Sequence, residues 1–480
     1  MGSEWTYSTI ADCASEEPFS TQIGPFGNKI KAEIYTPEGA PVLRGTNVNT
    51  DSRFNDADFV FIDQDYADSE FEKFTCKAGD VVLCHKGTLG KIGIIPKDSR
   101  FETYIMGNSM MKVRTDEEKL NSSFLYYWLC SFEGQDYLFS RVSQVGVPQI
   151  QRPLSSLREA EIPLPPLPEQ KAIAHILGTL DDKIELNRRM NATLEGMAQA
   201  LFKSWFVDFD PVIDNALAAG NPIPDELAPR AEVRRQALAN GTTQQGSLDH
   251  PTLSDPRSLF PAAFQETEEF GWIPEGWEMR AIGDSFQLLG GHSFKSGDYV
   301  EDGQFGIVTI KNVQDGSFVQ ECTNRITEIP GKMKSHCQLN SGDILLSLTG
   351  NVGRVCIVSE GDYLLNQRVS KIVGRNGIPE AFGYFFFRQE SLYERMITIA
   401  KGTAQQNLSP IETAKLEQVM PSNQTIAELG QHFRAYHTKM VGNTAQSQTL
   451  TKLRDTLLPK LISGELRLSD AEPLTEEALA

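Results

Sequence analysis

The sequence has no long hydrophobic runs, no cysteine pairs and few basic residues. No stretch of its 480 residues approaches the roughly 18 apolar residues of a membrane span. None of the seven cysteines forms a C-x-x-C pair or stands at zinc spacing from a histidine, so reduced thiols in a cytoplasmic protein are expected. The opening residues, MGSEWTYSTIADC, contain no basic patch and no apolar block, which predicts no signal peptide.

The shortage of basic residues bears on nucleic-acid binding. Lysine and arginine number 45 against 64 acidic residues, which gives a net charge of −19 and predicts weak affinity of the isolated chain for DNA. The charge is uneven, however. Residues 207–276 carry 12 acids and 4 bases, and residues 470–480 carry 4 acids and no base, so these two segments supply −12 of the −19. The remaining regions are only mildly acidic and can still present local basic faces.

Motifs of common enzymes are also missing. The sequence contains no Gly-x-Ser-x-Gly, no His-Glu-x-x-His and no Gly-x-Gly-x-x-Gly motif. The tetrapeptide NPIP at residues 221–224 lacks the aromatic residue of an adenine methyltransferase motif. The seven histidines show no regular spacing. We therefore predict no catalytic residue and no metal ligand in this chain.

Two long amphipathic segments dominate what is present. Residues 163–206 begin with several prolines and continue as a predicted helix on the order of 55 Å long. Its seam residues alternate steps of four and three, as in a helix that packs along one partner, although an ordinary core helix can show the same stripe. The register recurs 256 residues later, with Arg454 as its one charged member. The predicted seams are Ile173, Leu177, Leu180, Ile184, Asn187, Asn191, Leu194, Ala198, Leu201 and Trp205, and Leu429, Phe433, Tyr436, Met440, Asn443, Ser447, Leu450, Arg454, Leu457 and Leu461.

Both seams are apolar at their ends and polar in the middle, so the polar centres meet when the helices lie side by side. Buried polar residues at seam positions commonly fix register. We therefore predict an intramolecular two-stranded coiled coil, preferably antiparallel, with charged residues off the seam facing water, among them Lys171, Asp181, Lys183, Glu185, Arg188 and Arg189.

The two remaining globular regions are predicted to be β-rich, because short apolar runs alternate with Gly, Asp, Asn and Pro. One helix is expected at residues 121–130, with its aromatic residues in the core. The regions also resemble each other, most clearly in GDVVL at residues 79–83 and GDILL at residues 342–346. A tandem duplication of one sheet-plus-helix unit follows. The connecting segment is rich in Pro, Ala, Asn, Gly and Gln, and is expected to be a loop with one short helix near residues 232–239.

Each region also contains a Gly-x-x-Gly-basic turn between predicted strands, GTLGK at residues 87–91 and GNVGR at residues 350–354. A nucleotide-binding P-loop would need four residues between the glycines and a helix after the lysine. Two readings remain open: a tight hairpin with left-handed glycines, or a hairpin that touches a DNA backbone. Polar clusters in neighbouring predicted loops can either cap turns or read base edges.

Taken together, these features resemble the specificity subunit of type I restriction-modification systems over essentially the whole chain. The resemblance rests on PLPPLPEQ at residues 163–170, ILGTLDDKIELN at 176–187, LFKSWFVDFD at 201–210 and LLPKLISGEL at 457–466. It implies an α+β fold with two β-rich target-recognition domains in tandem, separated by a long antiparallel two-helix coiled coil. The implied segments are a first recognition domain (1–162), a first spacer helix (163–206), a linker (207–272), a second recognition domain (273–420), a second spacer helix (421–464) and an acidic tail (465–480).

The resemblance further implies a DNA-binding, non-enzymatic subunit that reads a bipartite target. Its implied partners are double-stranded DNA, two methyltransferase (modification) subunits and the restriction subunits, with SAM, ATP and Mg²⁺ on those partners and no cofactor on this chain. Implied DNA-facing residues of the first domain are Arg44, Asn47, Lys86, Thr88, Lys91, Asn108, Gln149 and Gln151. Those of the second are Lys311, Asn312, Thr349, Asn351, Arg354, Asn366, Gln367, Thr403, Gln405 and Gln406.

Two other functions remain open from the residues alone. A coiled-coil scaffold without DNA readout would suit the net acidity, and a stand-alone DNA methyltransferase or nuclease would need motifs that are missing. Incubating the chain with DNA, Mg²⁺ and SAM tests the enzyme, and a gel shift with and without methyltransferase subunits tests the scaffold.

Overall fold

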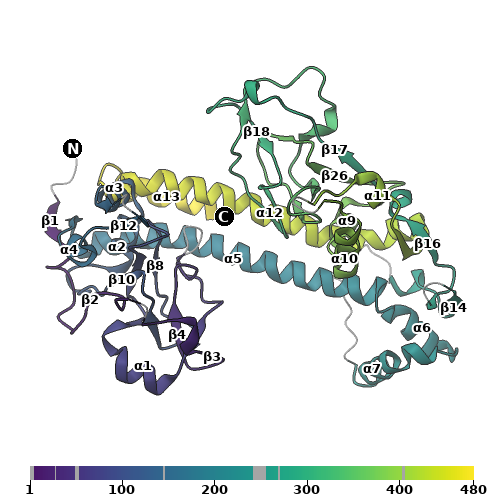
Figure 1. The fold of residues 1–480 in the computed structure, drawn as a ribbon, viewed down its shortest axis with the longest axis horizontal. Helices are drawn as coiled ribbons and strands as arrows, with labels where there is room; N and C mark the ends of the chain where they lie inside the picture. The colour runs from purple at the N-terminus through teal and green to yellow at the C-terminus, as the bar shows by residue number, and fades with distance from the viewer. Residues whose placement is uncertain are drawn as a thin grey trace. The chain divides into compact units, whose positions relative to one another are not determined.

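The computed structural model describes residues 5–27, 29–48, 53–143, 146–241, 256–268, 271–402 and 406–479. The chain forms two compact units. The first combines Met1–Asn187 with Gln446–Ala480, and the second is Arg188–Ala445. Each unit therefore contains one strand-rich region, which we call a head, and part of each of the two long helices (Figure 1).

The first head is built on two sheets. A four-stranded antiparallel sheet has the order β2-β10-β7-β8, and a five-stranded sheet has the order β3-β5-β4-β9-β6. Two short pairs, β1–β13 and β11–β12, accompany them. The strands are β1 (Thr6–Thr9), β2 (Thr21–Ile23), β3 (Tyr35–Thr36), β4 (Ala40–Leu43), β5 (Val60–Ile62), β6 (Thr75–Lys77), β7 (Val81–Cys84), β8 (Ile92–Ile94), β9 (Thr103–Met106), β10 (Met110–Val113), β11 (Val142–Ser143), β12 (Gln149–Ile150) and β13 (Glu161–Leu164).

The helices of the first head are α1 (Gln64–Glu70), α2 (Ser122–Cys130), α3 (Phe132–Phe139) and α4 (Pro153–Arg158). Helix α2 is the one predicted from the sequence, and the Asn121 side chain caps it by accepting the N–H of Phe124 at 3.1 Å. The aromatic residues of α2 are buried, as expected for a core role, and they belong to the same apolar cluster as Val81 and Leu83 of β7.

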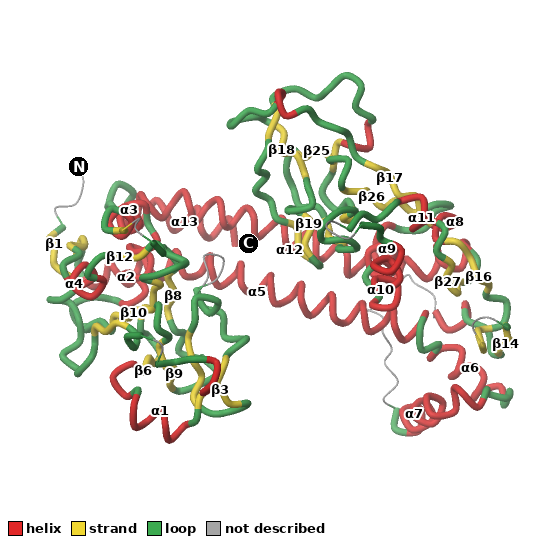
Figure 2. The backbone as a smooth tube through the Cα atoms, viewed as in Figure 1, coloured by secondary structure: helices red, strands yellow, loops and turns green. Residues whose placement is uncertain are grey.

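The second head repeats this plan (Figure 2). Its antiparallel sheet has the order β17-β26-β23-β24, and its second sheet the order β21-β18-β25-β22. One parallel pair occurs at the same place in each head, β4 with β9 and β18 with β25. The strands are β16 (Glu278–Ala281), β17 (Phe286–Gly290), β18 (Phe305–Val308), β19 (Val313–Gln314), β20 (Ser317–Phe318), β21 (Arg325–Ile326), β22 (Gln338–Leu339), β23 (Ile344–Ser347), β24 (Val355–Ile357), β25 (Tyr363–Leu365), β26 (Val369–Gly374) and β27 (Glu417–Met420).

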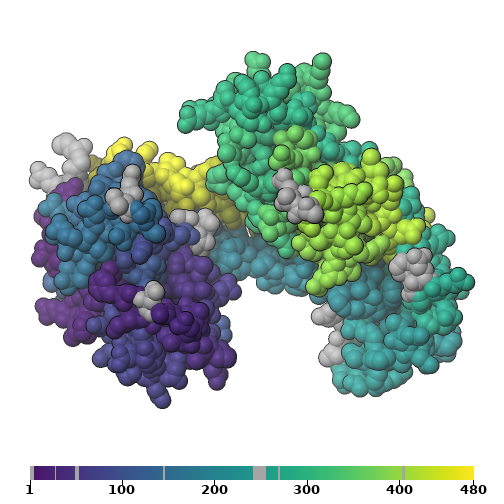
Figure 3. Space-filling model, viewed as in Figure 1, coloured from purple at the N-terminus to yellow at the C-terminus, as the bar shows by residue number. Residues whose placement is uncertain are grey.

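Further elements complete the second head. A hairpin of β14 (Phe264–Thr267) and β15 (Gly271–Pro274) precedes it, and its helices are α8 (Ile282–Ser285), α9 (Glu380–Phe387), α10 (Glu390–Ile399) and α11 (Pro410–Ala414). The sheet around β18 stands out as a green lobe beside the yellow-green surface of α9 to α11 (Figure 3). The matching strand orders confirm the tandem duplication.

The two long helices are α5 (Leu167–Phe206) and α12 (Asn423–Ile462). Two prolines stand immediately before α5, and the hydroxyl of Ser422 accepts the N–H of Thr425 at the start of α12. Most of their apolar seam residues are buried, including Leu177 and Leu180 in the first unit and Leu429 and Phe433 in the second, while Ile184 and Leu194 are half-buried. The predicted seam is therefore confirmed in both units.

The polar centres of the two helices meet, as predicted. In the first unit, the Asn187 amide donates to the Gln446 side chain at 3.0 Å. In the second unit, the Asn443 amide donates to Asn191 Oδ1 at 2.8 Å, and Asn191 donates to Thr444 Oγ1 at 3.1 Å. In the first unit, Asp181 and Asn187 contact Arg454 and Gln446, and in the second, Asn191 and Trp205 contact Asn443 and Phe433. Residue numbers therefore rise along α5 as those of the contacted residues fall along α12, which confirms antiparallel pairing.

Replacing Asn187 and Asn443 with leucine should leave the chain folded but loosen the register. Leucine supplies seam packing without the directional bonds that select one alignment. A pair of spin labels, one on each helix, measures this, and the distance distribution should broaden in the double variant. A distribution as narrow as that of the wild type would contradict a register role for these amides.

The prediction that Asp181 faces water is wrong. Its carboxylate is only 9% exposed, accepts the Tyr127 hydroxyl at 2.7 Å and pairs with the Arg454 guanidinium at 2.8 Å. Burial is tolerated because both oxygens have partners, one from α2 and one from α12. Arg454, the charged member of the second seam, is thus the counter-ion that joins helix to helix within the first unit.

The connecting segment holds more structure than the sequence indicates. Helices α6 (Asp210–Ala219) and α7 (Ala228–Ala239) form a hairpin. The Arg230 guanidinium bonds both oxygens of Asp210 at 2.7 Å, and Arg234 clasps Asp214 in the same way one turn later. Bidentate pairs of this kind are geometrically specific. The single short helix predicted near residues 232–239 is the second half of α7, and residues 242–255 lie outside the described part of the chain.

The acidic C-terminal segment contains a helix, α13 (Leu468–Leu479), whose Ala471 is buried against the core of the first unit. Within the described ranges, no helix combines the length and apolar character needed to span a lipid bilayer.

Candidate nucleic-acid interface

In the first head, three loops meet at the turn between β7 and β8. The N–H of Gly87 donates to the carbonyl of Pro148 at 3.1 Å, and the N–H of Ile150 donates to the carbonyl of His85 at 2.9 Å. The N–H of His85 in turn donates to the carbonyl of Ser109 at 2.9 Å. The turn, the β11–β12 hairpin and the loop before β10 are therefore joined by main-chain bonds, which do not depend on side-chain identity.

The same junction occurs in the second head. There the N–H of Gly350 donates to the carbonyl of Gln406 at 3.1 Å, and the N–H of Leu408 donates to the carbonyl of Leu348 at 2.7 Å. The N–H of Leu348 donates to the carbonyl of Arg368 at 3.0 Å. Each head thus presents a matched platform of three loops, on which different side chains can be displayed.

Glycines hold each turn against the helix behind it. Gly90 and Gly353 have φ values of +78° and +80°, which other residues rarely adopt. A Cβ at Gly90 would lie 2.9 Å from the Phe139 ring of α3, and one at Gly353 would lie 3.0 Å from the Tyr393 ring of α10. The Gly-x-x-Gly-basic sequence is thus a hairpin turn packed on the head, and the P-loop reading does not apply to it.

Several predicted DNA-facing side chains are exposed on the two platforms. Amide side chains suit adenine edges, and lysine suits phosphates or guanine. The exposed members are Lys86, Thr88, Gln149 and Gln151 in the first head, and Asn351, Gln367 and Gln406 in the second. Lys311, in the loop after β18, is exposed as well.

Other predicted residues are engaged within the protein. The Arg44 guanidinium donates to the Asp58 carbonyl at 2.7 Å, and the Thr349 hydroxyl donates to Asn407 at 2.9 Å. Arg354 is half-buried and bonded to Gln314 of β19. The remaining members are Lys91, which is half-buried, Asn108, whose amide donates to the Ile30 carbonyl at 3.2 Å, and Asn366, which is 8% exposed and accepts the Arg368 N–H at 3.1 Å.

Two predicted DNA-facing residues are buried, and we correct their assignment. Asn47 has no exposed surface, and its amide accepts the N–H of Arg44 while donating to the carbonyls of Asn55 and Ala57. All its hydrogen-bonding capacity toward a base edge is therefore used internally.

Asn312 does the same in the second head. It accepts the N–H of Thr309 at 2.9 Å and donates to the carbonyls of Val319 and Glu321. These two asparagines are matched loop clasps of the repeat. Thr403 and Gln405, which were also predicted to face DNA, lie outside the described residues.

The structure adds exposed cations that the residue-level prediction left out. Arg368 supplies its carbonyl to the second platform and exposes its side chain. Lys401 bridges to Asn407 through paired main-chain bonds of 3.0 and 2.8 Å and is also exposed. Both belong to polar clusters visible in the sequence, but their place beside the turn depends on main-chain pairing that no local pattern indicates.

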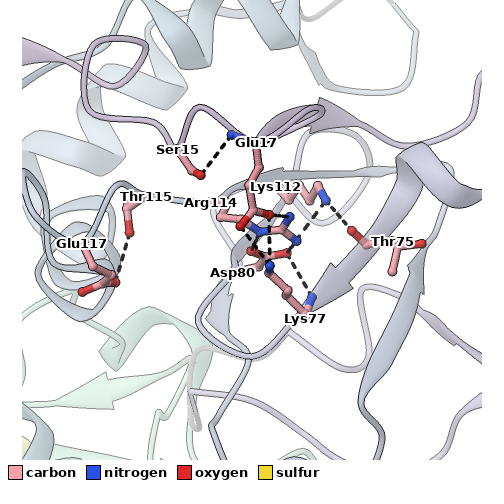
Figure 4. A network of polar contacts seen from close by, with 9 residues as sticks. All are labelled: Ser15, Glu17, Thr75, Lys77, Asp80, Lys112, Arg114, Thr115 and Glu117. Atoms are coloured by element: carbon pink, nitrogen blue, oxygen red, sulfur yellow. Dashed lines mark hydrogen bonds and ion pairs between the residues drawn. The ribbon is translucent and has the colours of Figure 1, made fainter.

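A buried ion network stands at the base of the first hairpin, directly before β7 (Figure 4). Asp80 is fully buried and accepts Arg114 Nε at 2.8 Å and Nη2 at 2.9 Å, with Lys112 Nζ 3.9 Å away. Glu17 joins from the surface through Arg114 and Lys77. Burial lowers the pKa of Lys112. The network fixes the strand on which the turn is carried.

The second head keeps a reduced version of this anchor. Asp343 pairs with Lys371 at 2.7 Å and accepts the N–H of Asn340 at 2.9 Å, as Asp80 accepts the N–H of Lys77 at 3.0 Å. The Gly-Asp motif that first indicated the repeat is therefore a bond at the strand start with a basic counter-ion beside it, and its role is to position the hairpin.

His85 makes the first platform sensitive to acid. Burial lowers the pKa of its imidazole in the folded protein. In the unfolded chain, the same imidazole should have the ordinary histidine pKa of about 6.5. The folded state therefore binds fewer protons, so stability is kept above about pH 6.5 and falls as the pH drops below it. We expect the urea midpoint of the wild type to fall more between pH 7 and pH 5 than that of His85→Gln. Equal pH dependence would contradict the assignment.

Among the described residues, no group of three or more His, Cys, Asp or Glu side chains is placed to hold a metal ion.

The family described as "Type I restriction modification DNA specificity domain" matches residues 26–196 and 274–421, one stretch for each head. The chain belongs to this family of type I DNA specificity proteins. DNA sequence recognition within a type I restriction-modification system is therefore its function, in preference to a coiled-coil scaffold without DNA readout.

Known type I specificity proteins are similar along most of their length. The HindI specificity subunit of Haemophilus influenzae is 28% identical, over 77% of this chain and 83% of its own. The MjaIX specificity subunit of Methanocaldococcus jannaschii is 24% identical, over 82% and 78%. The crystal structure of the S subunit from M. genitalium matches 95% of this chain and 96% of its own with a TM-score of 0.50 and 18% identity, which shows a shared fold.

Proposed function

We propose that each head reads one half of a bipartite DNA target through its three-loop platform. The observation that carries this is the recurrence of the same three main-chain bonds around both turns. A fixed main-chain frame lets the displayed side chains differ, which suits two heads that read two different half-sequences. Exposed lysines would contact phosphates, and the exposed amides would contact base edges.

We further propose that the chain is not itself an enzyme and that two modification subunits dock along the helix pair, which restriction subunits then join. The duplication supports this, because two similar units offer two similar docking surfaces. SAM, ATP and Mg²⁺ would be bound by those partners and none of them by this chain. The complex would work in the cytoplasm.

A gel shift with and without modification subunits tests the proposal. The chain carries −19 net charge, so alone it should bind DNA weakly and with little sequence preference. Adding modification subunits from the same system should produce a specific shift that competitor DNA lacking the target does not remove. Specific methylation of that DNA by the complex, but not by the chain alone, is also expected. Tight specific binding or methylation by the chain alone would contradict the division of labour.

A further inference from the structure

An open hollow of about 560 Å³ lies in the first unit where α3 faces the β1–β13 pair and the end of α12. Two aromatic rings stand at it with unusual exposure, Phe132 at 77% and Tyr7 at 70%. Exposed aromatic side chains that share one concavity mark contact surfaces for other proteins. Pro163 of β13 and Ile462, the last residue of α12, form part of the wall, so the hollow adjoins the end of one long helix.

The charge of the wall selects the chemistry of an occupant. Three carboxylates line the hollow, those of Glu133, Asp136 and Glu161, against one guanidinium, that of Arg141. Arg141 already has a partner within the protein, because its guanidinium carbon lies 3.6 Å from the centroid of the Tyr137 ring. The acidic excess and the aromatic faces together suit an additional arginine, which binds carboxylates and aromatic rings alike.

In the second unit, an arginine of the matching helix bonds the matching strand. Helix α10 follows α9 as α3 follows α2. Tyr137 lies six residues after Ser131, the residue before α3, and Arg395 lies six residues after Gln389, the residue before α10, so the two are counterparts. Arg395 donates to the carbonyl of Glu417 on β27 at 2.6 Å and to the Gln418 side chain. Glu417 is in turn the counterpart of Glu161, because Glu417 is the first residue of β27 in the pair β16–β27, and Glu161 is the first residue of β13 in the pair β1–β13.

The first unit lacks that arginine. Tyr137 stands in its place and directs its hydroxyl to the Ser156 carbonyl at 2.7 Å, which leaves the space before Glu161 open. The two units thus differ at this place, because an arginine of the second unit bonds its strand, whereas the first unit has a tyrosine that bonds elsewhere beside an open hollow.

We propose that this hollow receives an arginine-bearing segment of the modification subunit, with the guanidinium before Glu161 and neighbouring apolar side chains against Phe132 and Tyr7. The commitment to that subunit rests on the proposed function, because the hollow adjoins the end of α12, one of the two long helices along which we place its docking. The contact would give the two ends of the specificity chain different affinities for modification subunits, since Arg395 already bonds the matching strand in the second unit.

The test compares two equally exposed phenylalanines of the first unit. Phe132 and Phe26 are both 77% exposed, but only Phe132 lines the hollow. With the full chain and purified modification subunit, Phe132→Ser should weaken binding of the first modification subunit about 10-fold, as loss of an interface hot spot does, while Phe26→Ser should not. Tyr137→Arg, which copies the second unit, should weaken binding by a similar factor. Thermal unfolding of each variant verifies that it is folded.

A photo-crosslinking residue at position 132 then identifies the occupant, with position 26 as the control. The expected product joins position 132 to a modification-subunit segment that contains an arginine. Equal affinities of Phe132→Ser and Phe26→Ser, or a crosslink to a segment without arginine, would overturn the inference while leaving the docking of modification subunits intact. Failure of the wild-type chain to bind the modification subunit at all would overturn the proposed function and the inference with it.

Discussion

Replacing Arg368 and Lys401 together with alanine should weaken binding of the assembled complex to its target DNA about 100-fold. Both side chains are exposed on loops bonded to the turn of the second head. A hydrogen bond to a charged group contributes about 1.5–3 kcal/mol, so two lost phosphate contacts correspond to roughly two factors of ten. The slope of log affinity against log salt should also become shallower by about two, because fewer counterions are released on binding.

Sequence preference should survive this change, since phosphate contacts position a protein without reading bases. Fluorescence anisotropy at several salt concentrations, with specific and unrelated duplexes, measures both quantities. Lys415→Ala is the matched control, because Lys415 is exposed in the same unit but its ammonium already pairs with Glu412 at 2.9 Å. A salt slope unchanged from the wild type in the double variant would remove these loops from the DNA interface.

Replacing Asp181 with alanine should lower the free energy of unfolding of the first unit by about 3–5 kcal/mol, the usual cost of breaking one side of a buried ion pair. The loss leaves the Tyr127 hydroxyl without its partner and the Arg454 guanidinium with only the more exposed Asp455, in a site that is mostly shielded from water. It should also loosen the attachment of α2 to the helix pair, because the carboxylate is bonded to both.

The double variant Asp181→Leu with Arg454→Leu is the control for this prediction. It removes both charges, and apolar replacement of a buried pair is often neutral or stabilising, so most of the loss should be recovered. Urea unfolding of the full chain, followed by the signal of the first unit, compares the two variants. A single variant as stable as the wild type, or a double variant as unstable as the single, would contradict the account of Asp181 as a buried clasp.

The sequence was sufficient for the helices because their signal is local and periodic. Spacing alone placed Leu177, Leu180, Leu429 and Phe433 on buried seams, and the two polar centres predicted the pairing. The repeat was visible for a similar reason, since the Gly-Asp strand starts have the same bonds in both heads. Helix periodicity and strand-start motifs can be predicted from the sequence because the residues that cause them lie within a few positions of one another.

The sequence was insufficient where partners lie far apart along the chain. Asp181 looks like a solvent-facing residue of a helix, because its partners Tyr127 and Arg454 come from other elements. Asn47 and Asn312 show a related limit. The sequence around a loop asparagine does not indicate whether its amide faces solvent or bonds the main chain. The burial of Asn47 and Asn312 in the structure shows that theirs bond the main chain.

The central claim is that two similar heads each read a separate half of the target, and selection of bound DNA tests it most directly. A randomised pool is presented to the assembled complex, and the recovered sequences are compared for the wild type, Gln149→Ala and Gln406→Ala, whose exposed amides stand on the first and second platforms. The account predicts that each variant relaxes base preference in one half-site, and that the two affect different halves. Relaxation of the same half by both variants, or of neither, would contradict it.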